Sequence, residues 1–226
     1  MLTDAAMLER YARPPAMKPI LYLHGFASSI KSTKAQFFRQ KMAEFGHILT
    51  LLELDEGNFE AMTVTGQLAV IDRAVQETGG PVTLMGSSLG GYLAALYAAS
   101  HSEVERVILM APAFRFASRF KERFSPEQLE SWRKCGSTPI FHYGSNSLRP
   151  LSYEFIEDAS RYEEEPDIRQ PCLILHGTND TVVPPEISAE YAARHPNVIL
   201  RLLPSGHELT DVLDSLWKEV VKFQNL

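Results

Sequence analysis

Short apolar runs recur along the chain and predict the strands of a buried sheet. They occupy residues 20–23, 48–52, 82–85, 107–110, 172–175 and 198–203. The runs do not alternate strictly between apolar and polar residues, which is typical of strands covered on both faces. Segments with helical spacing of apolar positions separate most of these runs, at 33–45, 63–78, 89–101, 185–194 and 209–224. This order predicts an α/β fold, with a mostly parallel sheet of about six strands and helices on both faces.

One long spacing interrupts the regular alternation of strands and helices. About 60 residues separate the fourth run from the fifth, far more than a single crossover requires. Within this segment Phe116, Phe120 and Phe124 recur every four residues, which places an aromatic stripe on one helix. Ser125-Pro126-Glu127-Gln128 has the pattern of a capping box and marks the start of a second helix. We therefore expect a helical cap inserted at about residues 113–170.

The length of the chain bounds the number of domains. Its 226 residues suit one domain with an insertion better than two independent folds. We expect this domain to span residues 17–226 and to follow an N-terminal extension of residues 1–16. The extension has no long apolar core, which argues against a secretory signal. Met17 lies just before the first predicted strand, so it is a candidate for the natural start of translation.

Composition narrows the classes of partner and cofactor. The chain has 22 basic and 28 acidic side chains, a net charge of the wrong sign for binding nucleic acid. No apolar run approaches the roughly 20 residues that cross a bilayer, so we expect no membrane insertion. Cys135 and Cys172 form no CxxC motif, and their scarcity favours a reducing compartment, the cytoplasm. No histidine or acidic cluster has metal-ligand spacing, so we expect no metal and no cofactor. We expect a monomer or a small homo-oligomer.

A glycine-rich turn carries the first candidate catalytic residue. Gly86-Ser87-Ser88-Leu89-Gly90 matches the pattern G-x-S-x-G and lies between a predicted strand and a predicted helix. In such a turn a strained backbone lifts the hydroxyl of the middle residue clear of the sheet. The pattern therefore predicts Ser88, rather than Ser87, as a nucleophile. A turn that only packs a helix against a strand is the alternative interpretation.

A serine nucleophile needs a base, and the base needs a carboxylate that orients it. Asp180 follows the fifth predicted strand and His207 follows the sixth. Both loops lie at the carboxyl edge of the sheet, where open α/β sheets bind ligands. The chain order Ser88, Asp180, His207 is the order expected for this type of sheet. Asp158 in the cap and Glu208 beside the histidine are rival acids.

Further residues are expected around this nucleophile. Attack on a carbonyl places negative charge on its oxygen, which two backbone N–H groups can stabilise in an oxyanion hole. We expect these groups to come from Leu89, directly after the nucleophile, and from Phe26 in the loop after the first strand. The side chains expected to contact substrate are those of Phe26, Ser87, Phe114, Phe116 and His142.

Taken together, the motifs resemble those of the α/β-hydrolase superfamily. His-Gly-Phe, Gly-Ser-Ser-Leu-Gly-Gly, His-Gly-Thr-Asn-Asp and Gly-His-Glu follow their strands in that order, over about residues 19–226. Within the superfamily, LYLHGFASSIKSTKA and GSSLGGYLA resemble the small bacterial YqiA-type esterases. The resemblance implies an α/β-hydrolase fold and hydrolysis of a small-molecule carboxylic ester or acyl thioester through an acyl-enzyme. It also implies no cofactor, and it carries over Ser88, Asp180 and His207 as the catalytic triad.

The sequence leaves several alternatives open. An amidase or aminopeptidase-like enzyme and a carbon–carbon bond hydrolase use the same triad, and a non-catalytic scaffold would use the cap to bind a partner. Arg115, Arg119 and Arg123 lie beside the aromatic stripe. They would either contact a charged leaving group, such as the phosphates of a CoA ester, or pair with acidic residues of the neighbouring cap.

Overall fold

The computed structural model describes residues 18–226. The expectations about an extension at residues 1–16 and a start at Met17 lie outside the described residues. None of the helices in the described part is long and apolar enough to cross a membrane.

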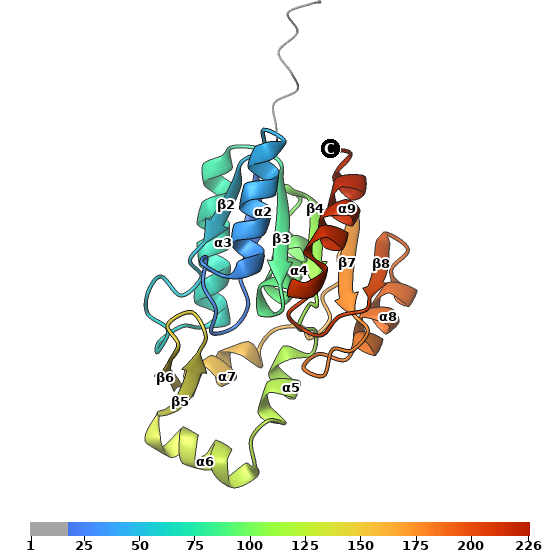
Figure 1. Cartoon of the computed structure of the whole chain (residues 1–226). Coiled ribbons are helices and arrows are strands. Elements are labelled where there is room, and N and C mark those ends of the chain that lie inside the picture. The colour runs from blue at the N-terminus through green and yellow to red at the C-terminus, as the bar shows by residue number, and fades with distance from the viewer. Residues whose placement is uncertain (1–17) are drawn as a thin grey trace, which may run out of the picture.

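Six parallel strands form the central sheet, in the order β2-β1-β3-β4-β7-β8 (Figure 1). Their bounds are β1 (Ile20–Leu23), β2 (Leu49–Leu52), β3 (Val82–Ser87), β4 (Val104–Met110), β7 (Cys172–Gly177) and β8 (Val198–Leu203). Each strand overlaps one of the six apolar runs, and β3, β4 and β7 extend two or three residues beyond it. Every residue of β1, β3 and β7 is buried, which explains why these runs do not alternate.

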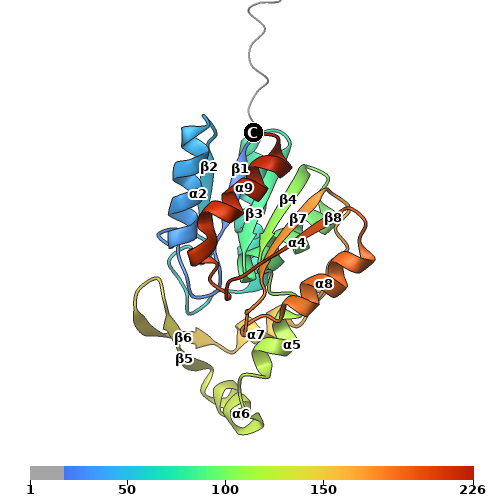
Figure 2. The same ribbon diagram turned by 45° about the vertical axis from the view of Figure 1, so that its right-hand side comes forward.

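Helices cover both faces of the sheet, and each face has its own apolar core. On one face lie α2 (Thr33–Glu44) and α9 (Leu213–Gln224), which Figure 2 shows side by side in front of the strands. The other face packs against α3 (Val64–Thr78), α4 (Leu89–Ser100) and α8 (Pro185–Arg194). The α/β fold predicted from the hydrophobic pattern is therefore confirmed.

The insertion between β4 and β7, residues 113–170, is called the cap below. It lies beyond the carboxyl ends of the strands, at the bottom of Figures 1 and 2. Its elements are α5 (Phe116–Lys121), α6 (Pro126–Cys135), β5 (Ser137–His142), β6 (Ser147–Ser152) and α7 (Glu154–Ala159). The capping box that opens α6 is present as expected.

The cap also contains an antiparallel β-hairpin, formed by β5 and β6, that the sequence pattern did not predict. Pro139 and Pro150 face each other in the two strands. Proline cannot donate to a strand ladder and argues against a strand assignment, so these two residues obscured the hairpin in the sequence. The cap therefore combines helices with a hairpin.

An aromatic cluster joins the cap to the sheet domain. The ring of Phe26, in the loop after β1, lies with its centroid 5.0 Å from that of Phe120 and 5.5 Å from that of Phe155. Phe116 and Phe59 complete the cluster around Phe26. Phe155 is fully buried and belongs to the same core cluster as the sheet residues. The cap and the sheet therefore share one hydrophobic core.

Because this core is shared, truncating Phe155 should destabilise the whole protein. We expect Phe155→Ala to lower the free energy of unfolding by about 3–5 kcal/mol, the usual cost of removing a buried ring. Urea unfolding should show one transition by tryptophan fluorescence and by circular dichroism. Phe141→Ala is the matched control, because Phe141 is 42% exposed on the hairpin and should cost less than about 0.5 kcal/mol. Two separate transitions, or equal effects of the two variants, would contradict a shared core.

Candidate active site

Ser88 lies in a strained turn between β3 and α4, with φ 53° and ψ −117°. Few residues other than glycine adopt a positive φ, because the side chain then clashes with the backbone. A Cβ at Gly86 would lie 2.2 Å from the carbonyl oxygen of Gly90, and one at Gly90 would lie 2.2 Å from that of Leu23. Only glycine fits at either position, so the motif reflects a close approach of three backbone segments.

Ser88, His207 and Asp180 form a continuous row of hydrogen bonds. Nε2 of His207 lies 3.0 Å from Oγ of Ser88, and Nδ1 lies 2.7 Å from Oδ2 of Asp180. An ionised carboxylate can only accept, so Nδ1–H donates to Asp180 and Nε2 accepts from the Ser88 hydroxyl. This arrangement can remove a proton from Ser88 and hold the resulting positive charge on the imidazole.

Asp180 is buried and held by several donors. Its Oδ1 accepts hydrogen bonds of 2.8 Å from the backbone N–H groups of Val182 and Val183. Its Oδ2 also accepts from Nε2 of His176, whose Nδ1 accepts from the Ser188 hydroxyl. Burial by itself raises the pKa of Asp180, but the hydrogen bonds from His176, His207 and Val183 hold it well below its usual range. Asp180 therefore stays ionised beside His207.

The two rival acids have other surroundings. The carboxylate of Asp158 accepts hydrogen bonds from the backbone N–H and the hydroxyl of Thr65, at 2.8 and 2.7 Å. The side chain of Glu208 is exposed to solvent. Of the three candidates, Asp180 is the one that contacts His207 in the described residues.

The loop after β1 lies directly against Ser88. A Cβ at Gly25 would lie 3.4 Å from Cβ of Ser88, so the Gly25-Phe26 turn borders the serine. Leu89 is the first residue of α4, where backbone N–H groups have no partner within the helix. Within residues 18–226 neither the Phe26 nor the Leu89 N–H has an acceptor. Both donors are therefore free to bind an anionic oxygen near Ser88.

His24 braces this loop, as its position at a strand end suggested. Its Nδ1–H donates to the Gly25 carbonyl at 2.9 Å, and its Nε2 accepts from the backbone N–H of Leu54. Burial lowers the pKa of His24, which keeps the ring neutral. The two bonds connect the loops that follow β1 and β2.

The side chains expected to contact substrate differ in how far they are buried. Phe26 is partly buried, and Phe116 packs beside it with 7% of its surface exposed. Ser87 is also largely buried. Phe114 has no exposed surface, because its ring stacks on that of Tyr191 at a centroid distance of 4.4 Å. Phe114 therefore packs inside the core, where a substrate has no access to it.

His142 ends β5, at the tip of the cap hairpin. Its Nδ1 accepts the backbone N–H of Ser145 at 3.0 Å, while its buried Nε2 has no partner in the described residues. The ring packs edge-on against Phe59. Burial, helped by the positive charge of Arg149, lowers the pKa of His142, so the ring is neutral.

The three cap arginines are engaged within the protein. Arg115 forms ion pairs with Glu165 in the cap and with Glu190 on α8. Arg119 donates to the carbonyl of Val182 at 2.7 Å, and Arg123 lies over the ring of Phe120. Of the three, only Arg115 pairs with an acidic residue of the cap in the described residues, and Arg119 and Arg123 make other contacts.

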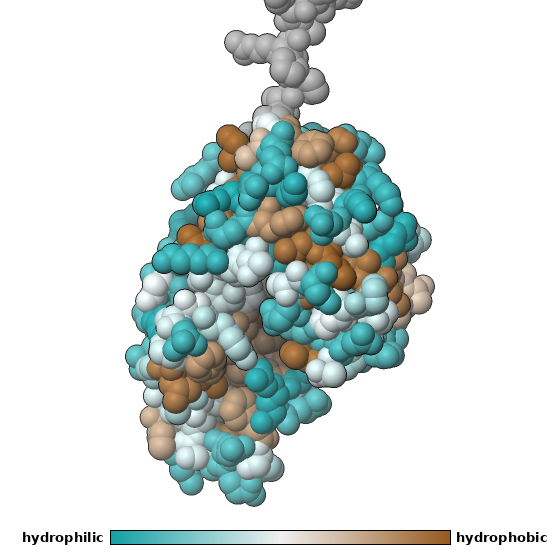
Figure 3. Space-filling model, in the orientation of Figure 1, coloured by the Kyte–Doolittle hydropathy of each residue, from teal (hydrophilic) through white to brown (hydrophobic). Residues whose placement is uncertain are grey.

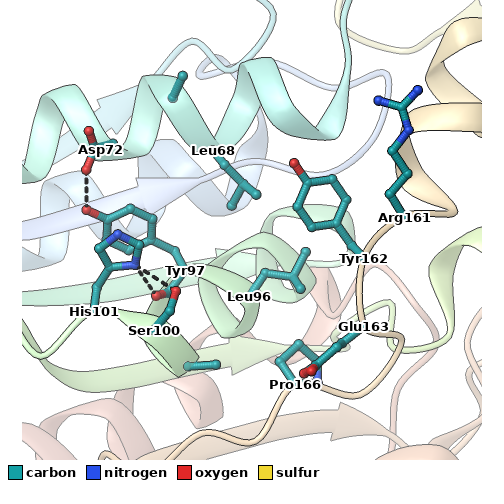
Figure 4. Close-up of a pocket in the computed structure, with 12 residues that line it drawn as sticks. Leu68, Asp72, Leu96, Tyr97, Ser100, His101, Arg161, Tyr162, Glu163 and Pro166 are labelled. Carbon is teal, nitrogen blue, oxygen red and sulfur yellow. Dashed lines mark hydrogen bonds between the residues drawn. The ribbon is translucent and has the colours of Figure 1, made fainter.

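The surface is hollowed beside the cap and beside α3 and α4. Figure 3 shows a hollow between the cap lobe and the sheet domain. A second, of about 550 Å³, lies between α3, α4 and residues 161–166. No residue of the hydrogen-bonded row lines this second hollow, and Figure 4 shows Tyr97 bonded to Asp72 and His101 to Ser100 there.

The environment of Asp180 predicts how stability depends on pH. A carboxyl whose pKa is depressed by folding stabilises the protein above its unfolded pKa, about 4, and loses that contribution as the pH falls. Between about pH 5 and pH 2, the free energy of unfolding should therefore fall more steeply for the wild type than for Asp180→Asn. Urea unfolding at a series of pH values measures both slopes. Parallel curves would contradict the role assigned to the hydrogen bonds on Asp180.

Known proteins share this fold. Palmitoyl-protein thioesterase ABHD10, mitochondrial, from Bos taurus is 24% identical over 225 residues, which cover 90% of this chain and 72% of that protein. The structure of Est1E from Butyrivibrio proteoclasticus with bound ferulic acid has a TM-score of 0.77 at 19% identity and covers 96% of this chain and 93% of its own. The structure of mouse ABHD10 has a TM-score of 0.72 at 21% identity, with 90% of each chain covered.

These similarities confirm the α/β-hydrolase fold that the motifs implied. A family model described as "Uncharacterised protein family (UPF0227)" matches residues 19–225, nearly the whole described chain. The match agrees with the resemblance to YqiA-type proteins noted in the motifs. The chain therefore belongs to the UPF0227 family of the α/β-hydrolase superfamily.

Proposed function

We propose that the protein is a serine hydrolase that cleaves carboxylic esters, including thioesters, through an acyl-enzyme on Ser88. The observation that carries this proposal is the row of hydrogen bonds from Ser88 through His207 to Asp180, at the end of a strained turn. The names of the similar proteins support the same reaction class. One is called a palmitoyl-protein thioesterase, and another was solved with ferulic acid bound.

In the proposed mechanism, Oγ of Ser88 attacks the carbonyl carbon of the substrate while Nε2 of His207 takes the hydroxyl proton. Asp180 accepts from Nδ1–H, so it holds the imidazole in the correct tautomer and stabilises its positive charge. The carbonyl oxygen becomes negative and accepts from the N–H groups of Phe26 and Leu89.

The tetrahedral intermediate then collapses, and the carbon–oxygen or carbon–sulfur bond of the leaving group breaks. His207 donates its proton to the departing oxygen or sulfur. A water molecule attacks the acyl-enzyme in the second half of the reaction, with His207 again as the base. The acid product leaves and the Ser88 hydroxyl is restored.

The acyl group would lie beside the aromatic cluster of Phe26 and Phe116, which offers apolar surface next to the proposed oxyanion hole. His142 and Ser87 are proposed to border the same space, and both are nearly buried.

We propose that the reaction takes place in the cytoplasm, which suits two unpaired cysteines. The bovine relative is described as mitochondrial.

Substitution of the nucleophile tests the proposal directly. Ser88→Ala should lower kcat/KM for p-nitrophenyl esters by at least about 1,000-fold, because within residues 18–226 no other hydroxyl contacts His207. Ser100→Ala is the matched control, because Ser100 is exposed at the far end of α4, and it should retain wild-type activity within about 2-fold. The panel should run from acetyl to palmitoyl esters and include the matching acyl-CoA thioesters and one p-nitroanilide.

The outcomes of this panel distinguish the proposed reaction from its alternatives. Ester or thioester cleavage that is lost with Ser88→Ala and kept with Ser100→Ala supports the proposal. More than a few per cent of wild-type activity in Ser88→Ala would overturn the role of Ser88. Faster cleavage of the anilide than of the matched ester would favour an amidase instead. A wild-type protein that cleaves nothing in the panel would contradict ester and thioester hydrolysis.

A further inference from the structure

Lys34 is a buried lysine whose ammonium group has an unusual partner. It is the second residue of α2 and is 8% exposed. Its Nζ donates a hydrogen bond of 2.5 Å to the backbone carbonyl of Glu208, 174 residues further along the chain. In the described part of the chain, no carboxylate lies within ion-pair distance of Nζ. The ammonium is therefore buried against a peptide carbonyl.

This placement is unfavourable for folding in two ways. Removing an ammonium group from water is costly unless a charge compensates it nearby. The N-terminus of a helix also carries a partial positive charge, so the dipole of α2 repels a cation in its first turn. The other buried residues of α2 are Ala35, Phe38 and Met42, all apolar. An apolar side chain at position 34 would pack with these neighbours, so the packing of α2 does not explain why this residue is a lysine.

The partner of Lys34 lies in the loop that carries His207. Glu208 directly follows His207, and Leu209 is fully buried with φ 55°. On its other side this loop packs against Gly177, where a Cβ would lie 2.3 Å from the carbonyl of Ser205. The loop is therefore held at both ends, and Lys34 holds the peptide group next to the histidine.

We propose that Lys34 is a positioning residue, which fixes the Glu208 carbonyl and thereby sets Nε2 of His207 against Oγ of Ser88. The inference rests on the proposed function, because it concerns the geometry of the same base. Lys34 bonds to the loop rather than to Ser88, Phe26 or Leu89, so its loss should affect the chemical step and leave substrate binding intact.

The ammonium also contributes an electrostatic effect. Burial lowers the pKa of Lys34, while the negative charges of Glu208 and Asp180 counter part of that shift. The titratable groups around the site come from three further elements: Asp180 and His176 at the end of β7, Glu208 after β8, and Tyr22 on β1. The ammonium thus adds positive charge close to the acid and to the loop that carries the proposed base.

The test compares three variants of the full-length protein: Lys34→Met, which removes charge and donor, Lys34→Arg, which keeps both, and Lys41→Met. The last is the matched control, because Lys41 lies on the same helix and, within residues 18–226, pairs only with Glu44. With the best ester substrate, Lys34→Met should lower kcat at least about 10-fold with KM within about 2-fold. Lys34→Arg should restore most of kcat, and Lys41→Met should match the wild type.

A proton NMR spectrum gives a second readout that needs no substrate. The Nδ1 proton that His207 shares with Asp180 should give a low-field signal in the wild type and in Lys41→Met. In Lys34→Met this signal should broaden or disappear. Rates are expressed per active site, titrated with a fluorophosphonate, so that a smaller folded fraction is not mistaken for a loss of kcat.

The outcomes separate this inference from the proposed function. A wild type no more active than Ser88→Ala would overturn the proposed function, and the NMR signal would still decide the role of Lys34. A Lys34→Met protein with wild-type kcat per active site and a wild-type NMR signal would overturn the inference. Loss of stability alone, with those two readouts unchanged, would show that Lys34 only packs α2 and would also overturn it.

Discussion

The close approach of three backbone segments at the carboxyl end of β3 sets the geometry of the whole candidate site. Gly86 and Gly90 leave no room for a side chain, because the backbones of β3, α4 and the end of β1 are in close contact there. This contact holds Ser88 at a positive φ and brings the Gly25-Phe26 turn beside it. The serine hydroxyl thus lies beside the loop that follows β1.

The cap covers the loops around Ser88 and also makes direct contacts with them. The ring of Phe26 is part of the cap's aromatic cluster, and the N–H of Gly144 in the hairpin donates to the carbonyl of Ala27. On the other side, Arg119 holds the carbonyl of Val182, whose N–H donates to Asp180. The cap therefore contacts both the loop after β1 and the loop that carries Asp180.

Features that depend on local patterns were predictable from the sequence, and features that depend on distant contacts were not. The strands were recognisable because burial on both faces leaves continuous apolar runs. Ser88, Asp180 and His207 were recognisable because each follows such a run, and the structure places them in hydrogen-bond contact. The hairpin of the cap was missed because of its prolines. The burial of Lys34 left no local signal, since it depends on a carbonyl 174 residues away.

The central claim is that the row of hydrogen bonds makes Ser88 a nucleophile, and covalent labelling tests it most directly. The protein is incubated with a fluorophosphonate, and the adduct is located by intact mass and peptide mass spectrometry. The account predicts one adduct per chain, on Ser88, that forms much more slowly in His207→Ala. No adduct, an adduct on Ser87, or a labelling rate indifferent to His207 would contradict it.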